Sequence, residues 1–162
     1  MVSPYFLTEN TLLPEIFVDA DSCPVKQEVF RVAKRCGLKV ILVANSPISL
    51  PKEDGISLVV VNNQLDAADD WIVNHATRND IVITGDIPLA ARCLKIGARV
   101  LEPKGDIFTD TNIGNILATR DLMTHLRFIG IDTSGPASFK KQDRSLFLQS
   151  LDKVIQAIRN SK

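Results

Sequence analysis

The sequence predicts an α/β fold, a three-layer α/β/α sandwich around a central, mostly parallel sheet. Short continuous apolar runs alternate with segments whose apolar residues recur at helical spacing. Such alternation favours a parallel sheet with helices on both faces. The 162 residues are 45% apolar and 23% charged, as in ordinary globular domains. We expect a leader over residues 1–14 and a single domain over residues 15–162.

The expected elements follow one another closely along the chain. The first strand ends in carboxylates at residues 16–20, and a helix begins near Pro24 and ends at Gly37. The other strands are expected at residues 40–44, 58–61, 81–84 and 99–101, of which 99–101 is the last. Further helices are expected after Asp66, over 88–96 and 111–127, and near the C-terminus, where the apolar stripe is Phe147, Leu151, Val154, Ile155 and Ile158.

Composition also excludes several classes of protein. No apolar run is long enough to span a bilayer, and the first 15 residues lack the basic region of a secretory signal. The three cysteines, without CxxC spacing, argue against disulfides and zinc knuckles and favour a reducing compartment, so we expect a cytoplasmic protein. The absence of net charge excludes a uniformly basic nucleic-acid binder. The acids nevertheless concentrate in the first half of the chain and the bases in the second.

Acidic residues gather where strands are expected to end. Ligands of open parallel sheets bind at the carboxyl ends of the strands. Carboxylates gathered there would repel one another by roughly 4 kcal/mol for a pair about 4 Å apart, so protonation, basic partners or a hard divalent cation must compensate. Mg²⁺ and Mn²⁺ prefer oxygen ligands and can activate water against a phosphodiester. Three clusters map to this edge: Asp19 with Asp21, then Asp66 with Asp69 and Asp70, then Asp86.

Several of these acids also have an ordinary structural interpretation. Asp66, Asp86 and Asp21 are each placed to cap a helix N-terminus. Asp69 or Asp70 would favourably complement a helix dipole. Asp19 is hardest to explain structurally, because an acid near the end of an apolar strand is costly without a partner.

Other polar residues offer weaker signals. Ser22 and Thr84 would hydrogen-bond the carboxylates or cap helices. Cys23 is expected to pack, His75 to lie buried in the apolar stripe of its helix, and His125 to face solvent. The bases available to hold phosphates are Lys26, Arg92, Arg120, Arg127, Lys140, Lys141 and Arg144.

Six strings in order carry a family resemblance: DADSCPVK (19–26), VANS (43–46), DAADDWI (66–72), TGDIPLAAR (84–92), RDLM (120–123) and GP…DR (135–144). Together they resemble the YaiI/YqxD family of uncharacterised bacterial proteins, which is grouped with the PIN-like domains. That resemblance implies a PIN-like α/β/α sandwich and the metal-dependent nuclease chemistry of the wider superfamily. It implies Asp19, Asp69, Asp70 and Asp86 as catalytic acids, the same four with Asp21 as metal ligands, and Ser22, Lys26, Asn45, Ser46, Thr84, Arg92 and Arg144 as substrate-binding candidates.

Three functions remain open on these grounds. The first is a Mg- or Mn-dependent nuclease acting on RNA or another nucleic acid. The second is a non-catalytic metal- or nucleic-acid-binding module. The third is a phosphotransferase of the haloacid-dehalogenase type with Asp19 as nucleophile, suggested by Asp19-Ala20-Asp21 although Ala90 stands where a further Asp is expected. The sequence leaves the oligomeric state open.

Overall fold

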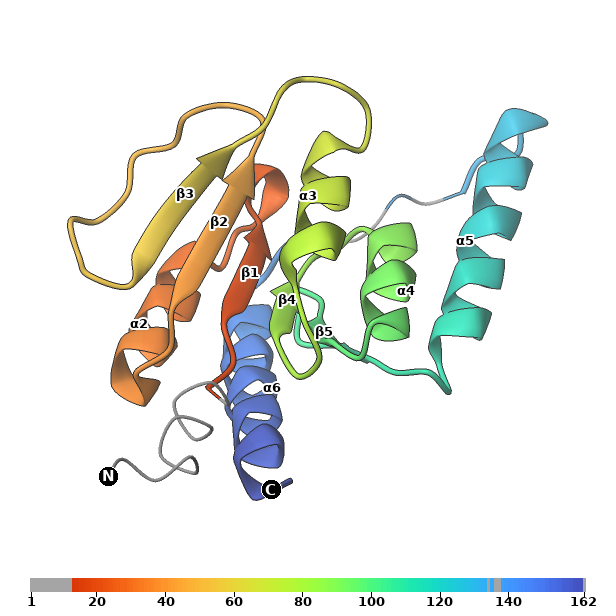
Figure 1. Ribbon diagram of the computed structural model, residues 1–162. Helices are drawn as coiled ribbons and strands as arrows, with labels where there is room; N and C mark the ends of the chain where they lie inside the picture. Colours follow the sequence, from red (N-terminus) through yellow and green to blue (C-terminus); the bar gives the residue numbers. More distant parts are fainter. Residues whose placement is uncertain (1–12, 134, 136–137, 162) are drawn as a thin grey trace, which may run out of the picture.

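The computed structural model describes residues 13–133, 135 and 138–161, so residues 1–12 of the expected leader lie outside it. The described chain builds a six-stranded sheet in the order β3-β2-β1-β4-β5-β6 (Figure 1). The first five strands are parallel and β6 runs antiparallel to β5. The strands are β1 (Ile16–Asp19), β2 (Val40–Ala44), β3 (Ile56–Val60), β4 (Ile81–Ile83), β5 (Arg99–Leu101) and β6 (Ile107–Phe108).

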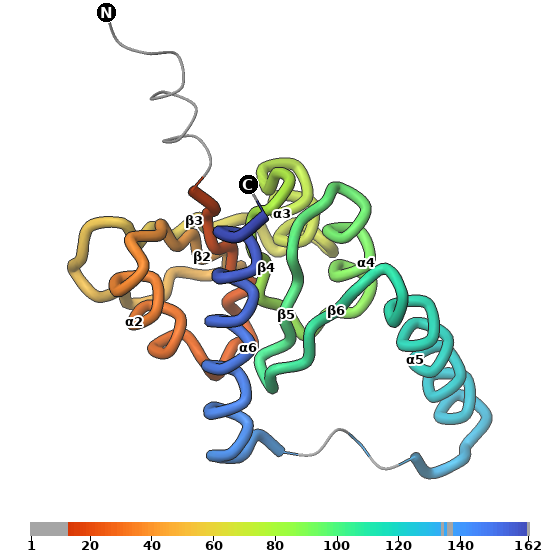
Figure 2. The backbone as a smooth tube through the Cα atoms, turned by 90° about the horizontal axis from the view of Figure 1, so that it is seen from below, coloured from red at the N-terminus to blue at the C-terminus, as the bar shows by residue number. Residues whose placement is uncertain are grey.

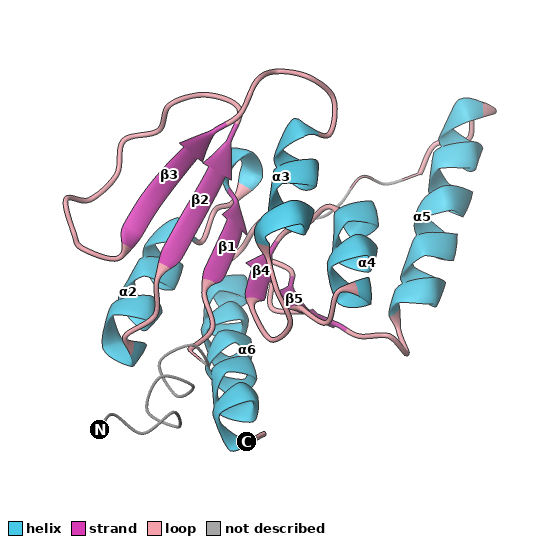
Figure 3. Ribbon diagram, in the orientation of Figure 1, coloured by secondary structure: helices cyan, strands magenta, loops and turns pink. Residues whose placement is uncertain are grey.

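Helices connect the strands and cover the sheet, as the colouring in Figure 3 shows. A short 3₁₀ turn, η1 (Ala20–Ser22), follows β1 directly. The α-helices of the described chain are α2 (Lys26–Cys36), α3 (Ala67–His75), α4 (Ile87–Lys95), α5 (Ile113–Phe128) and α6 (Lys141–Asn160). None of the helices in the described chain is both long enough and apolar enough to cross a membrane.

Two apolar clusters lie on opposite faces of the sheet, because successive side chains of a strand point to opposite sides. Ile16 and Val18 of β1 pack with residues of α2 and with Phe147 of α6. Between them, Phe17 packs on the other face with Ile72 of α3 and Leu89 of α4. The three-layer sandwich predicted from the sequence is therefore confirmed.

The far edge of the sheet corrects one prediction. Residues 99–101 form β5 as expected, but they are not the last strand, because β6 pairs with β5 across a tight turn. Gly105 in that turn has a φ of 102°, and a Cβ there would lie 2.8 Å from the Leu146 backbone. The turn therefore lies directly against α6, where only glycine fits.

His75 also differs from its prediction. The expected position inside the apolar stripe is wrong, since His75 is exposed at the end of α3. Its ring stacks on Trp71 with centroids 3.8 Å apart, and its Nδ1 lies 2.7 Å from the Trp71 carbonyl oxygen. His125 is exposed and Cys23 is buried, as predicted.

Helix α5 stands apart from the sandwich. It packs beside α4 on the side away from the sheet, so it lies farthest from the core (Figure 2). None of its residues is buried. Because α5 has 16 residues and α4 only 9, α5 extends past the end of its neighbour (Figure 1).

Candidate active site

The strand order creates one natural crevice at the carboxyl edge. From β1 the chain crosses through α2 to β2 on one side, while α3 leads from β3 to β4 on the other side of β1. The connections therefore diverge between β1 and β4, the kind of position where open α/β sheets bind ligands. Asp19 ends β1, and Asp86 follows β4 after two residues.

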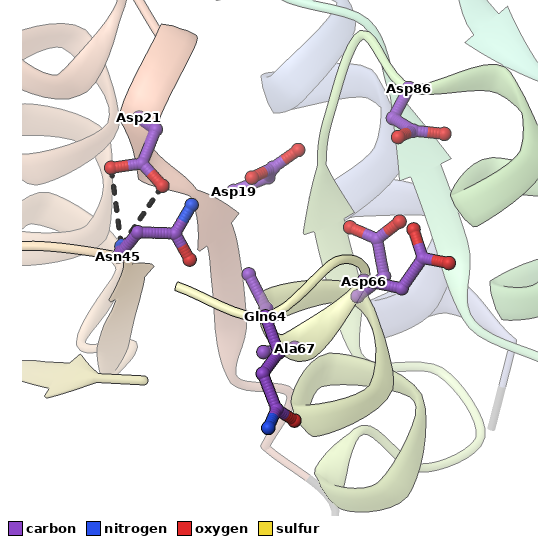
Figure 4. A pocket seen from close by; sticks show the side chains of 9 residues that line it. Asp19, Asp21, Asn45, Gln64, Asp66, Ala67 and Asp86 are labelled. Atoms are coloured by element: carbon purple, nitrogen blue, oxygen red, sulfur yellow. Dashed lines mark hydrogen bonds between the residues drawn. The ribbon is translucent and has the colours of Figure 1, made fainter. Parts of the chain in front are cut away.

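A hollow of about 230 Å³ lies at this point and is strongly acidic. Asp19 lies in the middle of the view in Figure 4, with Asp21 on one side and Asp66 and Asp86 on the other. The lining comprises Asp19, Asp21, Asn45, Gln64, Asp66, Ala67, Ala68, Asp69 and Asp86. Five carboxylates from β1, η1, the start of α3, α3 itself and the start of α4 therefore share one hollow.

Asp19 is held by a short relay of hydrogen bonds. The buried hydroxyl of Thr84 donates to Asp19 Oδ2 at 2.9 Å, and the backbone N–H of Asp86 donates to the Thr84 oxygen at 3.0 Å. Burial raises the pKa of Asp19, as do Asp86 and Asp21 less strongly, while the Thr84 hydrogen bond opposes the rise. Thr84 therefore orients the central carboxylate, one of the two roles predicted for it.

The pKa of Asp69 shows the effect of the negative charge in the hollow most clearly. Burial, followed by the negative charges of Asp86, Asp19 and Asp66, raises its pKa to about 7. The guanidinium of Arg92 acts in the opposite direction but does not cancel the effect. The acidic residues thus outweigh the nearby positive charge, so the hollow favours either protons or a cation.

Asp86 combines two functions that the sequence left as alternatives. Its Oδ1 accepts a hydrogen bond from the Leu89 N–H at 3.0 Å, so it caps α4 as expected. It also lines the hollow. Asp21 does not cap α2, because both of its carboxylate oxygens accept the N–H of Asn45, at 3.0 and 3.3 Å. That contact ties η1 to the end of β2 (Figure 4).

Asp66 corrects a capping prediction. It precedes α3, yet its side chain makes no capping hydrogen bond, and its φ of 63° lies in the left-handed region. Its carboxylate instead lines the hollow. Acid clustering alone pointed to this role, but the preference of Asp for N-caps obscured it. Gln64, Ala67 and Ala68 were not predicted, and no chemical signal in these residue types marks them.

Several predicted residues lie outside the hollow. Asp70, next to Asp69, forms an ion pair with Arg92 at 2.9 Å. Lys26 Nζ donates to the Cys23 carbonyl at 3.0 Å. Arg144 donates to Glu28 Oε1 at 2.8 Å. Ser22 and Ser46 are exposed and do not line the hollow either.

The donor set of the hollow contains only oxygen and amide groups. Neither histidine nor cysteine lines it. Within the described residues, no three His, Cys, Asp or Glu side chains are close enough together to hold a metal ion directly. Cys23 is buried, and burial raises its pKa to about 11, which makes it a poor nucleophile.

Comparison with known proteins places the chain among bacterial relatives. The family model described as "Uncharacterized BCR, YaiI/YqxD family" matches residues 17–157. A UPF0178 protein of Rhodospirillum centenum is 53% identical over 152 residues, covering 91% of this chain and 99% of that protein. A UPF0178 protein of Bradyrhizobium sp. is 48% identical over 156 residues, covering 96% of this chain and 95% of that protein.

A UPF0178 protein of Azorhizobium caulinodans is 49% identical over 146 residues, which cover 90% of this chain and 92% of that protein. The family match includes every aspartate of the hollow. With relatives near 50% identity along almost their whole length, this chain belongs to the uncharacterised YaiI/YqxD family.

Proposed function

We propose that this chain is a divalent-metal-dependent nuclease that cleaves RNA, with Asp19, Asp69 and Asp86 at its centre. One observation carries the proposal: five aspartates meet in one hollow at the carboxyl ends of the strands, where α/β sheets bind ligands. Structural ion pairing does not explain them, because burial and then the negative charges of Asp86, Asp19 and Asp66 raise the pKa of Asp69 to about 7 despite Arg92 nearby. A site with this surplus of negative charge would attract a cation.

The donors fit Mg²⁺ or Mn²⁺ better than softer metals. Carboxylate and amide oxygens suit these hard cations, whereas zinc and copper sites use His and Cys. The carboxylates are too far apart for three of them to bind one ion directly. Mg²⁺ keeps several water molecules and often takes only one or two protein carboxylates, so a hydrated ion would fit this spacing.

The residues of the chain would divide the work between holding the ion and holding the strand. When bound, the cation would supply positive charge beside a phosphodiester and an acidified water. Asp19, oriented by Thr84, and Asp86, fixed by its cap at Leu89, would provide rigid oxygen ligands. Asp69 would release its proton as the cation arrives, because a nearby positive charge favours the ionised carboxylate. Arg92, whose charge reaches Asp69, would lie beside the incoming phosphate.

Adjacent aspartates provide a matched test. Purified wild-type protein, Asp69→Asn and Asp70→Asn would be assayed on labelled single-stranded RNA with Mn²⁺, with Asp19→Asn as a second inactivating variant. Asp69 lines the hollow, whereas Asp70 pairs with Arg92 outside it. We expect Asp69→Asn and Asp19→Asn to lose at least about a hundredfold in rate. Asp70→Asn should stay within about threefold, because it alters only an exposed ion pair.

The same proteins distinguish the alternatives. Equal cleavage by wild type and Asp19→Asn would point to a contaminating nuclease and contradict the proposal. Stabilisation by Mn²⁺ without cleavage would favour a non-catalytic metal-binding module, because a ligand of the native state raises its melting temperature. Addition of beryllium fluoride to Asp19 would favour the phosphotransferase.

A further inference from the structure

A second cavity lies immediately beside the acidic hollow. It measures about 540 Å³ and lies between the loop before α4 and one side of α5, lined by Gly85, Ile87, Asn115, Ile116, Thr119 and Arg120. Gly85 and Ile87 flank Asp86, which lines the hollow. The two spaces are therefore lined by consecutive residues of one short loop.

The lining combines apolar surface with polar groups at the margin. Ile87 and Ile116 provide apolar surface on opposite sides. Asn115 and Thr119 add hydrogen-bonding groups, and Arg120 adds a positive charge. A cavity of this size and character suits a small ligand with apolar faces, polar edges and a negative charge. A nucleotide unit has all three properties.

We propose that this cavity binds a base of single-stranded RNA, with Arg120 on the adjoining phosphate, and so delivers the strand to the carboxylates of the hollow. The proposal rests on the proposed nuclease function for its choice of ligand. It goes beyond that function because it assigns a substrate subsite to α5, which contributes no residue to the hollow.

The rest of α5 supports a long, flexible ligand. Beyond Arg120 the helix extends past the first residues of α4 (Figure 1), and its large apolar side chains there are exposed within the part of the chain that the structure describes. Met123 is 39% exposed and Phe128 is 88% exposed. Bases of a single strand stack on exposed aromatic and apolar side chains with little sequence preference. Bases following the first one could therefore lie along this part of α5.

Charge argues against a second copy of the chain as the occupant. Arg120 and Arg127 are seven residues apart, so they lie on the same side of α5, beside its apolar face. A two-fold pairing of antiparallel α5 helices would set this edge against itself, with two arginines from each copy and only one acid, Asp121, whose carboxylate lies 3.7 Å from Arg120. A phosphate backbone instead brings the opposite charge to both side chains.

Binding in the absence of metal tests the subsite separately from catalysis. Anisotropy of a fluorescein-labelled eight-nucleotide RNA would be measured in EDTA with the full chain. Thr119→Trp fills the cavity from an exposed helix position and should raise Kd about tenfold. The control is Gln156→Trp, which changes an exposed residue of α6 that lines neither cavity and should leave Kd unchanged. Circular dichroism should show that both variants fold.

An abasic oligonucleotide separates recognition of the base from recognition of the phosphate. Thr119→Trp should not change its binding, whereas Arg120→Gln should weaken both probes about threefold and reduce the salt dependence. Equal Kd values for Thr119→Trp and Gln156→Trp, or no binding of RNA by the wild type, would overturn the subsite. So would self-association that Thr119→Trp abolishes without affecting RNA. If RNA binds as expected but is not cleaved with Mn²⁺, the subsite is supported and the nuclease function fails.

Discussion

Helices α6 and α5 both carry apolar residues throughout, yet they bury them very differently. In α6 the stripe predicted from the sequence is buried against the sheet, with Phe147 and Leu151 fully covered. In α5 no residue is buried, although Leu122, Met123 and Phe128 are large and apolar. The difference teaches that one helix holds the fold together, while the other leaves large apolar side chains exposed within the described part of the chain.

Two phenylalanines provide the strongest test of this contrast. Phe147→Ala removes a fully buried ring from the core and should lower the free energy of unfolding by about 4 kcal/mol. Phe128→Ala removes a ring that is 88% exposed and should change it by less than about 0.5 kcal/mol. Urea denaturation measures both. A comparable loss for the two variants would show that α5 belongs to the packed core after all.

A similar contrast separates two arginines. Arg144 donates to the carboxylate of Glu28, whose side chain is only 9% exposed and whose Oε2 has no partner. Arg144→Gln should cost about 2 kcal/mol, because it leaves a buried charge poorly compensated. Arg92→Gln breaks an exposed pair with Asp70 and should cost less than about 0.5 kcal/mol. Thermal and urea unfolding would rank the two variants. Adding Glu28→Gln to Arg144→Gln should restore part of the lost stability, and no recovery would contradict this explanation.

Two acids at helix starts sharpen the comparison within the hollow. Asp86→Ala removes the cap at Leu89 and should destabilise the protein by about 1 kcal/mol, whereas Asp86→Asn keeps an accepting oxygen and should cost much less. Asp66 makes no capping bond, so Asp66→Asn should leave stability nearly unchanged. Differential scanning calorimetry checks all three variants, and a loss for Asp66→Asn as large as that for Asp86→Ala would contradict the distinction.

The last expected effect is a dependence of stability on pH. Since the pKa of Asp69 is about 7 in the folded protein, against about 3.9 in an unfolded chain, the folded state binds more protons between these values. Stability should therefore fall as pH rises from about 4 to about 7. Asp69→Asn removes this loss, so its Tm should exceed that of the wild type at pH 8 and approach it at pH 4.

Asp70→Asn is the control for that pH series. Its side chain is 58% exposed and paired with Arg92, so its Tm should follow the wild type across the same range. A difference in Tm from the wild type that grows with pH for Asp69→Asn, and not for Asp70→Asn, would identify the hollow as the source. Parallel curves for all three proteins would contradict the assigned cause.

The sequence predicted best those elements whose signals are local. The bounds of β2 and β5 agree with the prediction, because each is a short apolar run with turn-forming residues nearby. The strand β6 was missed because it has two residues and exists only through its pairing with β5. The start of β3 at Ile56, before the predicted residue 58, likewise follows from pairing with β2.

The residues of the acidic hollow likewise divide into those that a local signal predicts and those that only the packing determines. Asp19 stood out because it ends an apolar strand, and it lies at the centre of the site. Asp69 and Asp70 could not be separated from sequence, because neighbouring helical residues point in different directions and packing decides which direction faces the hollow. Asp80, in contrast, is a buried acid with a structural role at the opposite edge of the sheet. Its carboxylate accepts hydrogen bonds from the backbone N–H groups of Glu15 and Thr77 and from the Thr77 hydroxyl.

The contact between Gly105 and α6 has a consequence for how the protein is made. Helix α6 covers β1 and anchors the turn through Ser150, whose hydroxyl donates to the Gly105 carbonyl at 2.6 Å. Ribosomes deliver every strand before this helix, so the part of this face that α2 does not cover meets water until α6 emerges. That interval is when a chaperone would be most useful, and a stalled chain ending before α6 should aggregate.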